Sequence, residues 1–314
     1  MSDNGIELTD ETRTMPDGTL VSRIRTTIDR AGRHGFSRAK AGDLGGWAAS
    51  ADSFRSQSAW VSDEAVIGPD VVLEGAAMVY RGAVVVGETR LEGRDSDGAA
   101  VSNTAVVAGP SVIDSTSSVH GRVRAFGVRL GGNATLGTRT VGTETVRALW
   151  ARLAGTRVIT TGDADAFVAN IVMTGGCISD GAVVQHNGHV LTVGPVGSEN
   201  VTATLYRAAN PANCRMVVGC WDGELSELPA EVKRRTEDEW IEMDADEFEV
   251  ELWGGEYETL QPLLEMRARY WLRHETVPEG WSPQPDLHLD GLYDWQQAHL
   301  TDEMRRAWGS QVIM

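Results

Sequence analysis

Lysine, cysteine and long apolar runs are all scarce in this sequence. Its 314 residues contain only two lysines, Lys40 and Lys233, and three cysteines, Cys177, Cys214 and Cys220. The cysteine number is odd and no pair has CxxC spacing, so the sequence predicts neither a disulfide framework nor a zinc-ribbon site. We expect the cysteines to be small buried side chains.

Membrane and export signals are also missing. No apolar run approaches the roughly 20 residues that span a bilayer, and the run at residues 83–86 ends at Gly87. Residues 1–5 lack the basic and apolar regions of a signal peptide. The sequence therefore predicts a cytoplasmic protein that has no membrane segment.

Cofactor motifs are absent as well. There is no GxxxxGK[ST] loop and no strand–GxGxxG–helix unit. No three histidines are spaced as a zinc site requires. We therefore predict no cofactor and no metal.

The acidic residues are unevenly placed within a net charge of −17. Residues 222–258 carry fifteen acids against three bases, a local balance of −12. Such a segment repels phosphate groups, which argues against general nucleic-acid binding.

A six-residue repeat is the strongest positive signal. Large apolar residues recur at this spacing, with interruptions: Val61, Ile67, Leu73, Val79, Val85, Leu91; Val101, Val107, Ile113, Val119; Leu130, Leu136; and Val172, Ile178, Val184, Val190. A small or β-branched residue follows most of them four positions later, as Ala65 follows Val61. Period six fits neither a helix nor a half-buried strand, but it fits a short strand followed by a corner. Three such sides close a coil of about 18 residues whose strands stack on the neighbouring coils.

This pattern resembles the hexapeptide-repeat superfamily, whose members form left-handed parallel β-helices and commonly trimerise. A narrower likeness to the YdcK-like group of phage and prophage proteins lies in AGDLGGW at residues 41–47, AWVS at 59–62, HVLTVGPVGS at 189–198 and VGCWDGEL at 218–225. The resemblance implies a homotrimer in the cytoplasm of a host cell.

The fold class we expect is mainly β. An N-terminal hairpin cap with a turn at residues 16–18 occupies residues 1–57, and the β-helix, with a short helical insertion near 145–155, occupies 58–198. A small acidic α+β module follows at 199–275. Strands are expected there at 201–207 and 215–220, one helix capped by Ser226, and another helix around residues 260–271. A Pro-rich tail and a terminal helix from Thr301 occupy 276–314.

Three histidines lie near the coils, His120, His186 and His189. Many members of the superfamily are acyltransferases that use coenzyme A thioesters and a histidine base at a coil edge. His120 follows an interior position and is expected to point outward, so it is the candidate base under that interpretation.

An arginine-rich stretch is the candidate ligand site. Within 36 residues that contain one acid, Glu144, the sequence places Arg122, Arg124, Arg129, Arg139, Arg147, Arg152 and Arg157. If they converge on the stacked coils, they would bind an anionic or nucleotide-like ligand. The favoured hypothesis is a non-catalytic solenoid that binds such a ligand or a host protein. The alternatives are an acyltransferase and a virion structural component.

Overall fold

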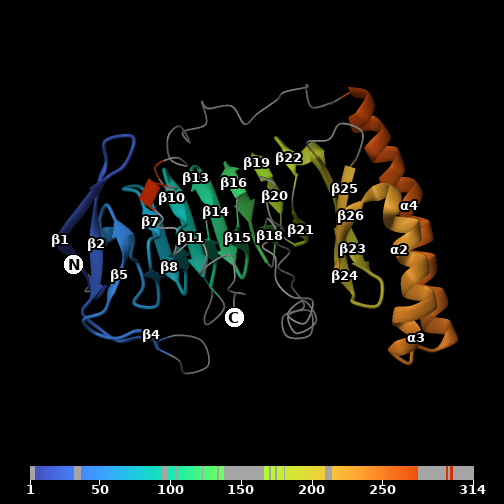
Figure 1. The fold of residues 1–314 in the computed structure, drawn as a ribbon, viewed down its shortest axis with the longest axis horizontal. Helices are drawn as coiled ribbons and strands as arrows, with labels where there is room; N and C mark the ends of the chain where they lie inside the picture. Colours follow the sequence, from blue (N-terminus) through green and yellow to red (C-terminus); the bar gives the residue numbers. More distant parts are fainter. Residues whose placement is uncertain are drawn as a thin grey trace.

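Three parallel sheets form the body of the molecule in a computed structural model (Figure 1). The structure describes residues 4–31, 37–93, 98–103, 105–121, 123–132, 134–137, 166–169, 171–173, 175–179, 181–208 and 214–274, together with residues 295, 298 and 299. The helix expected at 145–155 and the terminal helix from Thr301 lie outside these residues. Within them, no helix combines the length and apolar character needed to cross a bilayer.

Each sheet of the solenoid collects one side of every coil. The first contains β5 (Leu44–Ala48), β7 (Val66–Ile67), β10 (Val84–Val86), β13 (Val106–Ala108), β16 (Val123–Phe126), β19 (Ala166–Ala169) and β22 (Val183–Val184). The second contains β8 (Val72–Gly75), β11 (Thr89–Gly93), β14 (Ser111–Ser115), β17 (Arg129–Leu130) and β20 (Val172–Met173). The third contains β6 (Trp60–Val61), β9 (Met78–Arg81), β12 (Ala100–Asn103), β15 (Ser118–His120), β18 (Thr135–Gly137) and β21 (Cys177–Ile178).

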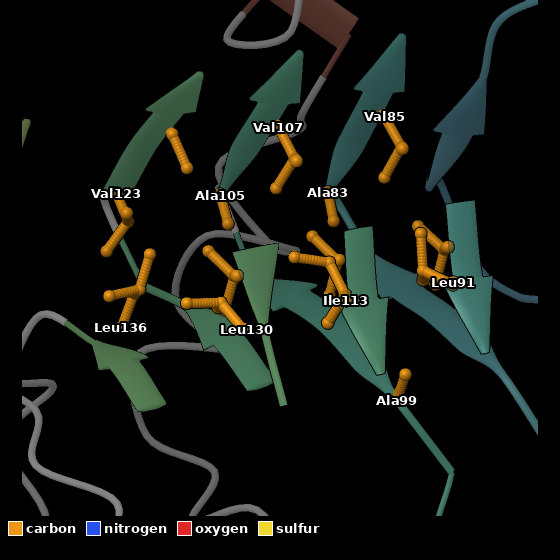
Figure 2. Close-up of a cluster of buried hydrophobic side chains, with 14 of the residues drawn as sticks. Ala83, Val85, Leu91, Ala99, Ala105, Val107, Ile113, Val123, Leu130 and Leu136 are labelled. Carbon is orange, nitrogen blue, oxygen red and sulfur yellow. The ribbon is translucent and has the colours of Figure 1, made fainter. Parts of the chain in front are cut away.

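The six-residue repeat fills the interior as predicted. Val61 pairs with Val79 in the next coil, 18 residues later, and Val79 pairs with Val101. The large residues and their small companions are buried together between the sheets, as Figure 2 shows for Val85 and Ala83. The predicted parallel β-helix is therefore confirmed, because stacking of equivalent positions is what buries each coil.

The last repeat block departs from the prediction. Met173, and not Val172, pairs with the interior residue Leu130. Met173 is 4% exposed and Val172 is 55% exposed. Met173 lies five positions before Ile178. Counting back six positions therefore selects Val172 in place of Met173. A shift of one residue in a strand turns the side chain to the opposite face.

Val190 was also expected to continue the coil, and it packs against the solenoid core, but it does not lie in a parallel coil strand. It begins β23 (Val190–Val196), which pairs antiparallel with β24 (Val201–Arg207). The four-stranded sheet continues with β25 (Cys214–Val218) and β26 (Trp221–Glu224). Tyr206 and Val217 from this sheet belong to the solenoid core, so the sheet closes that end of the solenoid.

The N-terminal hairpin closes the other end. Strands β1 (Ile6–Thr14) and β2 (Leu20–Thr26) pair antiparallel, and β2 extends the first solenoid sheet through β5. A short ribbon, β3 (Arg30–Ala31) with β4 (Ser37–Ala39), follows. A Cβ atom on Gly45 would lie 2.6 Å from the carbonyl oxygen of Val61, so glycine is needed for β5 to lie on the first coil.

Buried polar contacts fix this N-terminal cap. Arg30 is fully buried, and its guanidinium donates to the carbonyl oxygens of Asn4, Gly5, Gln57 and Ala59. Burial lowers the pKa of Arg30 to about 10. These hydrogen bonds join the start of the hairpin to the first coil, because two of the carbonyls directly precede β1 and the other two precede β6.

Outside the solenoid interior, the first sheet carries a second apolar cluster. Trp47, Val66, Val84 and Val106 are buried on its outer face, and Trp295 packs against this cluster. The indole nitrogen of Trp295 donates to the carbonyl oxygen of Thr14 over 2.8 Å. A residue from the C-terminal part of the chain thus covers a sheet at the N-terminal end.

Candidate binding groove in the C-terminal module

His120 is not the exposed base that the sequence predicted. It lies on β15 beside Val119, which faces the interior, but its side chain is 2% exposed. Among the described residues, neither ring nitrogen has a hydrogen-bond partner, and burial lowers the pKa of His120 to about 4. The expectation failed because an outward side chain is exposed only where nothing covers the coil. Ser102, its neighbour in the adjacent coil, is buried as well.

The other two histidines form a turn at the end of the solenoid. His186 caps a single 3₁₀ turn over Asn187–His189, which His189 ends, and the two ring centroids lie 3.8 Å apart. Nδ1 of His186 accepts from the Gly188 amide, and Nδ1 of His189 accepts from the Gln185 amide. Both rings are thus engaged in holding the backbone.

The arginine-rich stretch is described only at two positions. Arg124 lies on β16 in the first solenoid sheet, and Arg129 lies on β17 in the second. The two therefore stand on different faces of the coil. Arg122, Arg139, Arg147, Arg152 and Arg157 lie outside the described residues, so the anion site stays a prediction.

The three cysteines are free thiols, and Cys177 and Cys214 are buried as expected. Burial raises the pKa of Cys214 to about 11. The half-buried Cys220 lies with Glu199 and Glu239 in a group whose ligand atoms are within 4.8 Å of one another. Cationic side chains already occupy this group, because Arg235 contacts Glu199 at 3.5 Å and Arg234 contacts Glu239 at 2.6 Å. We assign it as an ion-pair network.

The C-terminal helices are longer than the sequence indicated. A 3₁₀ turn (Leu225–Glu227), α2 (Leu228–Arg234), a π-helical turn (Arg235–Glu239) and α3 (Trp240–Glu242) follow one another. Ser226 does not cap this segment, since Glu224 and Glu227 form the capping box. Then α4 runs from Glu247 to His274, and a reciprocal pair between Asp246 and Glu249 caps its start.

One face of α4 packs against the four-stranded sheet (Figure 1). Tyr257, Leu260, Leu264, Ala268 and Trp271 are buried on it. They recur every three or four residues, as one helix face requires. Trp271 also donates its indole hydrogen to the carbonyl oxygen of Gly188 over 2.7 Å. The position of α4 is thus tied both to the sheet and to the end of the solenoid.

The opposite face of α4 is also apolar, and it is exposed. We call it the α4 stripe, and its positions are Phe248, Leu252, Gly255, Thr259, Leu263, Met266 and Tyr270. The large side chains in it are 41% to 71% exposed. A helix that is apolar on two faces normally has a neighbour on each. Within the described part of the chain, the stripe has no such neighbour.

A groove of about 720 Å³ runs between the α4 stripe and the edge strand β23. We call it the α4 groove. Val193, Pro195 and Val196 line it from the strand, and Phe248, Leu252 and Leu263 line it from the helix. Its charged lining residues are acids, Glu251 and Glu256. Glu256 accepts from the Gly197 amide over 2.7 Å, which connects the helix to the end of β23.

The groove has the chemistry of a contact surface. Apolar walls bury apolar groups of a partner, and a carboxylate rim disfavours an anionic ligand. Its lining holds no histidine, cysteine or serine, and one of its two carboxylates, that of Glu256, already accepts from the Gly197 amide. The chain matches no model of a known protein family, and no curated protein is similar to it.

Sequence reasoning missed this groove, although a signal was present. The helix around residues 260–271 is predicted from the spacing of Leu260, Leu263, Leu264, Arg267, Tyr270 and Trp271. On a helical wheel Leu260, Leu264 and Trp271 lie on one side, and Leu263 and Tyr270 lie about 90° away from them. Only the first group packs on the sheet. Separating the faces and extending them to Phe248 would have revealed a second apolar surface.

Proposed function

We propose that this chain is a non-catalytic β-solenoid that acts by binding, and that the α4 groove contacts a protein partner. The observation that carries the proposal is the exposed α4 stripe beside an apolar groove of about 720 Å³. Exposed apolar surface of this extent on an ordered helix is typical of a protein–protein contact. The solenoid then serves as a rigid support for the C-terminal module.

A protein partner is favoured over a small anionic ligand. Residues 247–258 of α4 carry five acids and no base, and two of these acids line the groove. An anion would meet a repulsive field there, whereas apolar side chains would be buried. An anion site at the arginine-rich stretch is a separate hypothesis.

Acyl transfer is the alternative, and the histidine geometry supports it less. His120 is buried with a lowered pKa, while His186 and His189 hold backbone amides. A general base needs access to the substrate proton. A virion structural role is the second alternative, and it predicts that the chain is present in purified particles. We also propose a phage origin and a host partner, and only the resemblance to phage and prophage proteins supports these two points.

Site-specific photo-cross-linking tests the proposal. A photoreactive residue in place of Leu252 or Leu263 is expected to give a discrete cross-linked species in cells that express the protein. Leu20, which is 57% exposed on the hairpin, is the matched control and should give none. The proposal fails if Leu252 and Leu263 give no product, or give the same products as Leu20.

A further inference from the structure

The α4 stripe has the same character in both directions from Thr259. Phe248 and Tyr270 each lie eleven residues from Thr259, so an aromatic side chain matches an aromatic one. Leu252 and Met266 each lie seven residues from it, so two long aliphatic side chains also match. In an antiparallel pair of identical helices centred on Thr259, each would face its counterpart, as an isologous contact requires.

The charges beside the stripe reverse sign across Thr259. The N-terminal half of α4 carries five acids and no base, while the C-terminal half carries one acid and Arg267, Arg269 and Arg273. Glu251 and Arg269 are 18 residues apart, which is five helical turns, so they lie on the same flank. Both are exposed, and neither forms an ion pair in the described part of the chain. Antiparallel helices would place Glu251 of each copy beside Arg269 of the other.

Gly255 supplies a third, independent observation. A Cβ atom added there would meet no heavy atom within 4 Å. Glycine inside a helix costs about 1 kcal/mol relative to alanine, and no described residue crowds Gly255 or its neighbour Gly254, which lies off the stripe. Leu263 lies as far beyond Thr259 as Gly255 lies before it. The missing side chain would admit a leucine from an antiparallel partner.

We propose that the α4 stripe binds a second copy of this chain, with the two α4 helices antiparallel about a two-fold axis beside Thr259. The inference rests on the proposed function and names its partner. A parallel pair is disfavoured because it would set acids against acids and arginines against arginines.

The contact is compatible with the trimer that the hexapeptide resemblance implies. Helix α4 lies beyond the four-stranded sheet, at the end of the molecule farthest from the N-terminal hairpin (Figure 1). Pairing through α4 therefore leaves the solenoid faces free. Breaking this contact should halve the assembly mass whether the starting assembly is a dimer or a pair of trimers.

Disulfide trapping tests the arrangement in the full-length chain. Thr259→Cys should cross-link to its own copy under mild oxidation, because it lies at the axis. Phe248→Cys should cross-link when mixed with Tyr270→Cys, but not with itself. Glu265→Cys, on another side of the same helix, and the wild-type protein are the controls. Self-cross-linking of Phe248→Cys, or equal cross-linking of Glu265→Cys, overturns the antiparallel arrangement.

Charge reversal gives a second test that does not depend on thiols. Glu251→Arg and Arg269→Glu should each weaken self-association about 10-fold in sedimentation measurements, and the double variant should recover most of it. Glu242→Arg, exposed on α3, is the control and should have no effect. Unchanged association in both single variants overturns the inference. If a different protein is then cross-linked at Leu252, the binding function stands without the second copy, and if nothing is cross-linked both proposals fail.

Discussion

Trp271 donates a 2.7 Å hydrogen bond to the carbonyl oxygen of Gly188, 83 residues earlier in the chain. The contact joins α4 to the turn in which the solenoid ends, and it places the buried face of the helix on the four-stranded sheet. The α4 stripe faces outward as a consequence. The position of the α4 groove thus depends on how α4 is attached to the end of the solenoid.

Loss of this bond should loosen the module without unfolding the coils. Trp271→Phe keeps most of the apolar contact but leaves the Gly188 carbonyl without its donor, so we expect a loss of about 1–2 kcal/mol. Trp271→Ala also removes a large buried side chain and should cost about 3–5 kcal/mol. Hydrogen exchange should show faster opening of α4 than of the solenoid strands. Equal opening in both regions would contradict this role.

His120 should make the fold sensitive to acid. Its pKa is lowered by burial to about 4, whereas a histidine in an unfolded chain titrates near 6.5. Between these pH values the unfolded chain binds more protons than the folded one. Titration of His120 therefore lowers the free energy of unfolding as pH decreases from 6.5 to 4, by roughly 3 kcal/mol in total.

The matching variant is His120→Leu. Neither ring nitrogen has a hydrogen-bond partner in the described part of the chain, so an apolar side chain of similar size should leave stability at pH 7.5 within about 1 kcal/mol of wild type. Urea denaturation at several pH values should show a flatter acid dependence in the variant. An unchanged pH dependence would exclude His120 as its source, and loss of a measured acyl transfer would instead favour the catalytic alternative.

Glu64 holds the outer side of the N-terminal cap. It contacts Arg13 at 2.6 Å and Arg23 at 2.9 Å, and it accepts from the indole of Trp47 at 3.1 Å. Burial alone would raise the pKa of Glu64, but hydrogen bonds and charge from the two arginines outweigh burial and lower it. The ionised Glu64 therefore stabilises the fold above the pKa of a glutamate in the unfolded chain. This stabilisation is lost as pH falls through the lowered pKa of Glu64 in the folded state.

Replacing Glu64 with glutamine should cost about 2 kcal/mol at pH 7, because two largely buried guanidinium groups lose their carboxylate. Glu7→Gln provides the comparison, since Glu7 pairs with Arg25 on an exposed surface and should change stability by less than about 0.5 kcal/mol. Thermal denaturation measures both. Equal effects would show that burial of the Glu64 cluster does not matter.

Arg30 should tolerate no substitution by lysine. One ammonium group cannot replace donors that reach four backbone carbonyls on two sides of the cap. We expect Arg30→Lys to lose about 3 kcal/mol and to expose the N-terminal hairpin to limited proteolysis. Arg25→Lys, at an exposed ion pair, should behave as wild type. A stable and protease-resistant Arg30→Lys variant would contradict the assigned role.

The solenoid was predictable because its signal is periodic and local. Val61, Val79 and Val101 are interior for one reason, which is the stacking of equivalent positions. Val172 was wrongly predicted to be interior because the spacing between interior residues is five at this point and not six. The exposure of His120 was predicted wrongly because alternation along one strand indicates the direction of a side chain and not its exposure. The α4 groove requires the helix, the edge strand and their relative placement, which no local pattern of residues specifies.

The most direct test of the account is the mass of the native assembly, measured by light scattering for the wild-type protein and for Leu252→Glu. A carboxylate within an apolar contact should separate the copies, so the variant is expected to have half the wild-type mass and an unchanged circular dichroism spectrum. Leu20→Glu, on the hairpin, should keep the wild-type mass. Identical masses for wild type and Leu252→Glu would contradict the assignment of the α4 stripe as a contact between copies.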